Sequence, residues 1–333
     1  MTNRLTGKYD TLNSLLTAIP EPDTLSTILE SAISEGGVLS GKLEVLSRKP
    51  NKYYSTFPSE IVTCRIGNER EIMLFCKYSD DLDHEAHGHR GGVEYEADVY
   101  RRLLQGLDLP SPALYGIYRD PAKNRTGLVL EYLADSARVI KTSEPEAMDK
   151  AARWIGRFHA LCSKRLSSPA LSFLRRYDPD YYKGWARRTL QMTEQSGLGS
   201  RWLETLSHRF DEVIDALYDS PPTIIHGEYY PENILLKDGM VYPVDWESTA
   251  VGSGEIDLVT LTEGWGQDAI QGLELEYQQA RWPDGPPHDF QRSLCAARIY
   301  IQFRWLGDRP DWTRYQQQRL EVLRKHAKEM GLI

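Results

Sequence analysis

The residues between 226 and 247 combine side chains that can bind a metal and orient a hydroxyl group. Glu228 and Asn233 precede an apolar run at 234–236, and a Lys-Asp-Gly turn leads into a second run that ends at Asp245. Carboxylate and carboxamide oxygens are the ligands that Mg²⁺ prefers, and a positioned carboxylate can accept a hydroxyl proton. The pattern predicts a strand-turn-strand unit that carries both functions.

A second pair of residues has the types needed to hold an anion. Strand alternation places Lys77 on the same face as Met73 and Phe75. The next segment, 93–105, has helical period, and Glu96 lies beside its apolar stripe. A carboxylate at the edge of a buried stripe requires a partner, whereas Glu94 lies on the opposite, solvated face.

Composition limits the class of protein. The chain has 333 residues, enough for two domains or one bilobal unit, and its net charge of -8 argues against a nucleic-acid partner. Its four cysteines lack CxxC spacing, and no apolar window is long enough for a membrane span. We therefore expect a cytoplasmic enzyme with reduced cysteines, which acts on small molecules and binds no membrane.

Strands come first in the chain and helices follow, which predicts the α+β class. Five strands are expected at 43–46, 53–66, 71–78, 114–118 and 128–133, forming an antiparallel sheet with one helix at 93–105. Further helices are expected at 25–33, capped by Asp23 or Thr24, and at 147–162, 293–306 and 314–330. We place the lobe boundary after Leu133. The N-terminal lobe is then 1–133, with an accessory helical start at 1–35, and the C-terminal helical lobe is 134–333.

These features together resemble the aminoglycoside phosphotransferase and choline kinase family, over roughly residues 40 to 310. The resemblance implies a bilobal protein-kinase-like fold and transfer of the γ-phosphate of ATP or GTP to a small-molecule hydroxyl. The acceptor could be an aminoglycoside-like antibiotic, a sugar or an amino alcohol. Carried over by motif, Glu228 is the catalytic acid, and Asn233 and Asp245 bind Mg²⁺. His226 is expected to brace the loop.

The resemblance also assigns nucleotide-binding residues. Lys77, held by Glu96, contacts the phosphates, and the strand end from Glu131 to Leu133 corresponds to the hinge that binds the adenine edge. Asp257, in the Gly-Ser-Gly-Glu-Ile-Asp segment, is expected to brace the catalytic loop or to cap a helix.

Two positions depart from the family pattern. The family usually has Asp where this chain has Glu228, and the extra methylene moves the carboxylate by about 1.5 Å. The loop that should cover the phosphates, residues 47–55, contains no glycine. These departures support an alternative hypothesis, a nucleotide-binding pseudokinase that acts as a scaffold or regulator.

Several histidines invite other interpretations. His84, His87 and His89 lie among acidic residues, but without a second ligand cluster they indicate a polar solvated loop rather than a metal site. His159 is expected to be a hydrogen-bonded core residue. His226-Gly227-Glu228 matches half of a zinc deaminase motif, but the chain lacks the required P-C-x-x-C half.

Overall fold

The computed structural model describes residues 19–36, 42–51, 57–67, 70–79, 87–120, 125–144, 146–308 and 315–333. The chain divides into two compact units. Unit 1 comprises Met1–Glu85 and Arg90–Ser136, and unit 2 comprises Ala86–His89 and Ala137–Ile333. Residues 87–89 therefore belong with the second unit, which no pattern in the sequence predicted.

Unit 1 is built on a five-stranded antiparallel sheet with the order β1-β2-β3-β5-β4. The strands are β1 (Leu43–Pro50), β2 (Ser59–Ile66), β3 (Arg70–Tyr78), β4 (Leu114–Asp120) and β5 (Arg125–Glu131). The predicted sheet is confirmed. β2 begins at Ser59 rather than at Tyr53, and Tyr53 lies outside the described residues.

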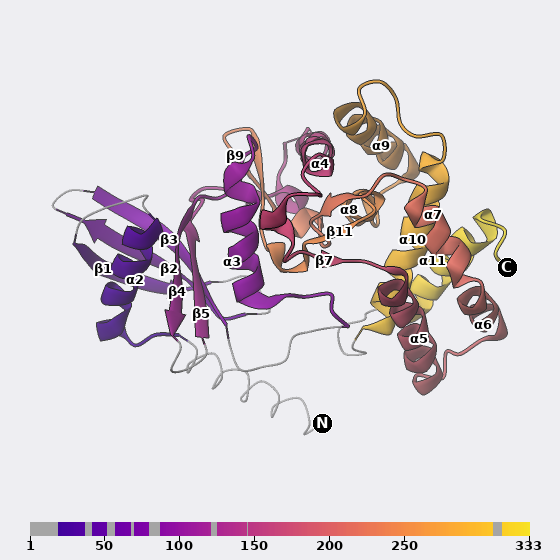
Figure 1. Ribbon diagram of the computed structural model, residues 1–333, viewed down its shortest axis with the longest axis horizontal. Coiled ribbons are helices and arrows are strands. Elements are labelled where there is room, and N and C mark those ends of the chain that lie inside the picture. The colour runs from indigo at the N-terminus through magenta and orange to yellow at the C-terminus, as the bar shows by residue number, and fades with distance from the viewer. Residues whose placement is uncertain are drawn as a thin grey trace. The chain divides into compact units, whose positions relative to one another are not determined.

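Two helices cover opposite faces of this sheet (Figure 1). Leu25 and Leu29 of α2 (Pro22–Gly36) pack with Leu74 and Cys76 of β3 in one hydrophobic cluster. The other helix, α3 (Gly92–Arg102), is followed by a short 3₁₀ turn, η1 (Leu104–Gly106). Because strand side chains alternate, the β3 face that carries Lys77 is opposite the face that packs on α2.

The predicted cap of the first helix is wrong. α2 begins at Pro22, so Asp23 and Thr24 lie inside its first turn rather than before it. The Thr24 hydroxyl donates to the Glu21 carbonyl at 2.9 Å. Proline is favoured at the first helical position because its missing N–H would have no intrahelical acceptor there.

Unit 2 is mostly helical, and α10 (Phe290–Gly307) packs against α5, α7, α8 and α11. Its long apolar run predicted this buried helix. The other helices are α4 (Ala147–Ser163), α5 (Pro179–Gln195), α6 (Arg201–His208), α7 (Phe210–Tyr218), α8 (Glu255–Thr262), α9 (Gln267–Arg281) and α11 (Gln316–Glu329). In the described part of the chain, every helix is too short or too polar to cross a lipid bilayer.

Unit 2 also contains two small sheets, and the predicted strand-turn-strand unit forms part of one of them. One contains the hairpin of β9 (Ile234–Lys237) and β10 (Met240–Pro243), extended by β6 (Ala137–Arg138). The other has the order β7-β11-β8, formed by β7 (Arg175–Arg176), β8 (Thr223–Ile225) and β11 (Ala250–Gly252). β6, β7 and β11 were not predicted because two or three residues carry no readable alternation. The α+β class is confirmed.

Candidate active site

The loop between β8 and β9 carries the predicted catalytic residue Glu228 and the predicted metal ligand Asn233, and it turns at Gly227. This residue has φ +84, and a Cβ built there would lie 2.2 Å from the Ser248 carbonyl oxygen. Only glycine combines positive φ with such a close backbone approach. Gly227 therefore lets the loop lie directly against the segment that follows Asp245.

Asp257, in the first turn of α8, holds this loop by its backbone. Its Oδ2 accepts the His226 N–H at 2.7 Å, and its Oδ1 accepts the Gly227 N–H at 2.8 Å. The expectation that Asp257 braces the loop is confirmed. His159 is also confirmed as a core histidine, since its Nε2 lies 3.0 Å from Asp257 Oδ2 and its Nδ1 lies 2.9 Å from the Tyr277 hydroxyl. Burial lowers the pKa of His159.

His226 links the loop to the second half of the hairpin, as predicted. Its Nδ1 accepts the Glu228 N–H at 3.3 Å, so Nε2 carries the proton and donates to the Val244 carbonyl at 3.0 Å. The ring is fully buried. It therefore fixes Glu228 relative to the residue that precedes Asp245.

Asp245 has an unusual backbone conformation, with φ 69 and ψ 63. This left-handed region is uncommon for residues other than glycine, and strain of this kind concentrates at functional sites. The next residues form the 3₁₀ turn η5 (Trp246–Ser248), and the buried Trp246 indole donates to the Pro243 carbonyl at 3.1 Å. The turn thus places the Asp245 carboxylate at a fixed point after β10.

Three carboxylates meet at this point. One oxygen each from Glu228, Asp245 and Glu247 lies within 4.8 Å of the others. Glu247 is 1% exposed. Like charges at this spacing repel one another, and a divalent cation bound by oxygen ligands relieves that repulsion. The sequence prediction missed Glu247, although its position two residues after Asp245 was a usable signal.

Asn233 is held by a hydrogen bond from its amide nitrogen to the loop backbone. It ends the short 3₁₀ turn η4 (Pro231–Asn233), and its Nδ2 donates to the Glu228 carbonyl at 3.1 Å. This bond uses the amide nitrogen and leaves Oδ1 as the atom that can act as a metal ligand. Unit 2 therefore brings together Glu228, Asn233 and Asp245, as the motif predicted. Their chemical roles stay predictions.

Unit 1 contains the Lys77 and Glu96 pair. Lys77 Nζ and Glu96 Oε2 are 2.7 Å apart, and the two side chains are 3% and 2% exposed. Glu94 instead lies on the exposed face of α3, 3.2 Å from Arg119. The helical period therefore chose the right partner, and contact of Lys77 with a nucleotide stays a prediction.

The predicted hinge residues lie at the end of β5. Glu131 is opposite Leu74 of β3, and its N–H donates to the Ala113 carbonyl at 2.8 Å. Leu133 is buried, and its carbonyl accepts the Ser136 hydroxyl at 2.8 Å. A role for Glu131 and Leu133 in nucleotide binding stays a prediction.

The interpretation of the histidine segment as a solvated loop is wrong for His89, which is 1% exposed. Its Nε2 lies 3.2 Å from Glu228 Oε1, and its Nδ1 lies 3.1 Å from the Tyr177 hydroxyl. His87 packs on the ring of Tyr181, and His84 lies outside the described residues. Charged neighbours in the sequence suggested exposure, but His89 packs on aromatic residues that are distant in the sequence, Tyr177 just before α5 and Trp185 within it.

A buried cation lies beside the same loop. Arg304 of α10 is 4% exposed and donates to the Gly227 carbonyl at 2.8 Å and to the Tyr230 hydroxyl. Burial by itself would lower the pKa of Arg304, but nearby Tyr230 and Glu228 outweigh it, and the pKa lies above its usual value. The sequence signal for this contact was an arginine between apolar neighbours, Phe303 and Trp305, near the end of α10.

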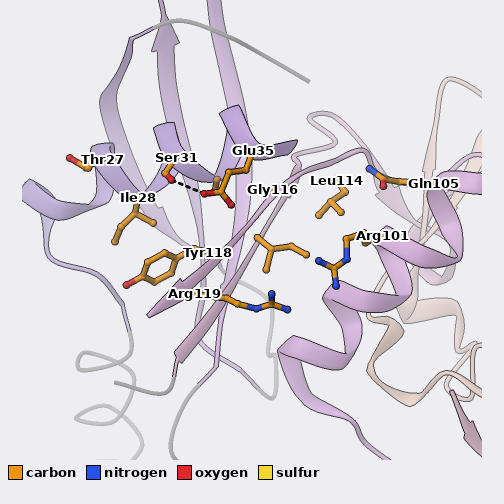
Figure 2. Close-up of a pocket in the computed structure, with 12 residues that line it drawn as sticks. Thr27, Ile28, Ser31, Glu35, Arg101, Gln105, Leu114, Gly116, Tyr118 and Arg119 are labelled. Atoms are coloured by element: carbon orange, nitrogen blue, oxygen red, sulfur yellow. Dashed lines mark hydrogen bonds between the residues drawn. The ribbon is translucent and has the colours of Figure 1, made fainter. Parts of the chain in front are cut away.

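Unit 1 also contains a pocket of about 580 Å³, which holds none of the predicted site residues (Figure 2). Arg101 and Arg119 line one side, and Ser31 donates to Glu35 on the other. Both arginines already have acidic partners on α3, Asp98 and Glu94. The charge of this pocket is therefore balanced without a ligand.

Comparison with known proteins shows which family this chain belongs to. The model of the phosphotransferase enzyme family matches residues 83–290, more than half of the chain. The chain belongs to the phosphotransferase enzyme family. Membership confirms the predicted class of enzyme, a small-molecule kinase. A search of curated protein sequences finds no significant match.

Solved structures similar to this phosphotransferase share its fold at low identity. A choline/ethanolamine kinase family protein from Mesorhizobium loti is 18% identical, with 97% of each chain covered and a TM-score of 0.58. A choline kinase from Cryptosporidium parvum is 14% identical, with 94% of this chain and 98% of that chain covered and a TM-score of 0.61. The GDP complex of aminoglycoside 2'-phosphotransferase-IIIa is 12% identical, with 93% and 99% covered and a TM-score of 0.62. The predicted kinase-like fold is confirmed.

Proposed function

We propose that this phosphotransferase moves the γ-phosphate of ATP or GTP to a hydroxyl group of a small molecule, with Mg²⁺ as the metal. The observation that carries the proposal is the meeting of Glu228, Asp245 and Glu247 within 4.8 Å, beside Asn233. Phosphoryl transfer needs positioning and charge neutralisation more than covalent help from the protein. A braced loop that offers several oxygen ligands supplies both.

In this proposal unit 2 holds the metal and the acceptor. Asn233 Oδ1 and Asp245 would hold Mg²⁺, and the ion would supply positive charge to the phosphate oxygens. Glu228 orients the acceptor hydroxyl and accepts its proton. Glu247 adds negative charge to the metal site from its buried position beside the other two carboxylates.

Unit 1 supplies the nucleotide contacts. Lys77, with its ammonium group fixed by Glu96 at 2.7 Å, binds the phosphates. Glu131 and Leu133 bind the base through their backbone groups. Similar folds have been solved as complexes with GDP and, for a spectinomycin phosphotransferase, with ADP, which supports a nucleotide co-substrate without choosing between ATP and GTP.

The acceptor class is a small hydroxylated molecule. The similar structures include kinases named for choline, aminopropanol and aminoglycosides, which are amino alcohols or amino sugars. Aminoglycoside-like antibiotics, sugars and amino alcohols are therefore the acceptors to screen. In this chain such an acceptor would present its hydroxyl to Glu228.

The experiment compares wild type with Glu228→Gln for nucleoside diphosphate release on a panel of hydroxylated acceptors. Loss of the catalytic base is expected to lower turnover by about 10² to 10⁴-fold. The Mg-nucleotide thermal shift should persist, and Glu232→Gln, an exposed neighbour in the same loop, is the matched control. If wild type and Glu228→Gln are equally inactive while Mg-nucleotide still binds, the enzyme proposal fails and the scaffold hypothesis replaces it.

A further inference from the structure

The imidazole of His89 stands between the buried cation Arg304 and the carboxylate of Glu228. His89 Nε2 lies 2.8 Å from Arg304 Nη1 and 3.2 Å from Glu228 Oε1. We propose that His89 is a positioning residue that keeps Arg304 from forming a direct ion pair with Glu228. The proposal rests on the function proposed above for Glu228.

Arg304 would be a strong competitor for this carboxylate. Its guanidinium is buried and permanently charged, and a direct arginine-carboxylate contact is among the strongest side-chain interactions. Such a contact would occupy the oxygens that must receive the acceptor hydroxyl. Within the described residues, Arg304 donates instead to the Gly227 carbonyl, the Tyr230 hydroxyl and His89.

The surroundings of His89 fix it as a neutral spacer. Arginine only donates hydrogen bonds, so Nε2 accepts from Arg304 and Nδ1 carries the ring proton. Nδ1 then donates to the Tyr177 oxygen at 3.1 Å, and the Tyr177 hydroxyl donates to the Ser248 carbonyl at 3.3 Å. Glu228 therefore touches the ring without receiving a proton from it.

Aromatic packing prevents the ring from turning away. The rings of Tyr177 and Tyr181 are stacked, with their centroids 3.9 Å apart. The rings of Trp185 and His89 pack edge to face, with their centroids 6.3 Å apart. The Tyr181 hydroxyl lies 2.9 Å from that of Tyr300, which closes the same cluster. The spacer is therefore held by side chains from α5 and α10 and is not a surface loop residue.

The spacer also accounts for glutamate at the catalytic position. Glutamate has one more rotatable bond than aspartate, so its carboxylate can reach more positions, including one against Arg304. A rigid ring placed between the two groups removes that alternative. His89 thereby confines the longer side chain to the side of the loop where Asp245 and Glu247 lie.

The test compares His89→Ala with His87→Ala, a control in the same segment whose ring contacts Tyr181 and Trp185 but not Glu228. Turnover is followed with MgATP or MgGTP and an acceptor identified in the panel. We expect His89→Ala to lower kcat about 100-fold, since misplacement by about 1 Å costs this much. The KM for nucleotide should change less than about threefold, and His87→Ala should keep kcat within about threefold.

His89→Gln provides the rescue. Its amide oxygen can accept from Arg304 while the side chain fills part of the space, so it should recover at least about tenfold of the lost kcat. In a Glu228→Gln background, His89→Ala should cause little further loss, because both changes act on the same carboxylate.

Equal kcat for His89→Ala and His87→Ala, or losses that simply multiply with Glu228→Gln, would overturn the role of His89 while leaving the phosphotransferase function intact. A wild-type protein without turnover on any acceptor would overturn both.

Discussion

The two units handle buried charge in opposite ways. In unit 1, Lys77 and Glu96 form one ion pair at 2.7 Å, and both side chains are almost fully buried. In unit 2, the oxygens of Glu228, Asp245 and Glu247 gather within 4.8 Å of one another. The first arrangement is neutral as it stands, whereas the second concentrates negative charge.

This difference indicates where a ligand is required. A buried pair satisfies its own charges, so Lys77 is held ready and the fold does not depend on a nucleotide. A cluster of carboxylates repels itself until a cation binds. We therefore expect metal binding to matter most in unit 2, and charge removal to have opposite effects on the stability of the two sites.

The largest effect on stability is expected at the ion pair. Lys77→Met leaves Glu96 buried without its cation and should lower the free energy of unfolding by about 3 to 5 kcal/mol. Combining it with Glu96→Leu removes both charges and should restore most of that stability. Chemical denaturation measures both variants, with the exposed Glu94→Gln as control. A single variant as stable as wild type would show that the pair is not held as described.

A smaller loss of stability is expected on substitution of Gly227, which lets the loop carrying Glu228 lie against the segment that follows Asp245. Gly227→Ala would place a Cβ 2.2 Å from the Ser248 carbonyl oxygen at φ +84. The strain should cost about 1 to 3 kcal/mol and displace the loop, so turnover should also fall. Gly272→Ala, in α9 with no atom within 4 Å of the added Cβ, is the matched control. Equal stability of the two variants would show that the close approach of Gly227 to the Ser248 carbonyl does not constrain the loop.

Removal of a charge from the carboxylate cluster should raise the free energy of unfolding, whereas the two changes above lower it. In metal-free buffer, Glu247→Gln is expected to raise the free energy of unfolding by about 1 kcal/mol, because one like charge is lost. The gain should disappear with saturating Mg-nucleotide. Thermal unfolding with EDTA and with Mg²⁺ measures both states. Destabilisation in EDTA would mean that Glu247 is not repelled by its neighbours.

The smallest effect concerns His159, which bonds to the buried carboxylate of Asp257, itself held by the backbone N–H groups of His226 and Gly227. Burial lowers the pKa of His159 from 6.5, so below pH 6.5 the unfolded chain binds a proton that the folded protein does not. Stability is therefore complete above pH 6.5 and falls as the pH drops toward the folded pKa. His159→Gln should show a shallower decline of Tm between pH 7.5 and 5.5, and an unchanged slope would contradict this.

Local patterns in the sequence predicted what local geometry determines. Strand alternation gave the five strands and the face of Lys77, and helical period selected Glu96 over Glu94. The hairpin motif placed Glu228 and Asn233 before its first strand and Asp245 after its second. Each of these inferences needs only the periods of strands and helices and the chemistry of side chains.

Long-range packing could not be read in the same way. His89 and Glu228 are separated by 139 positions, and nothing near either residue indicates the other. The aromatic residues that pack on His89 are Tyr177, 88 positions away in the sequence, and Trp185 of α5, so the charged sequence neighbours of His89 suggested the wrong environment. Asp23 and Thr24 were misplaced for a different reason, because Pro22 occupies the first helical position and the helix therefore begins before them.

The most direct test is the thermal shift given by ATP and by GTP, with Mg²⁺ and with EDTA, for wild type and Asp245→Asn. We predict that nucleotide at 100 times its Kd stabilises wild type by about 2.7 kcal/mol when Mg²⁺ is present. Asp245→Asn should lose the Mg-dependent part of that shift. An unchanged shift in Asp245→Asn would contradict the account, because metal binding would not depend on the carboxylate cluster.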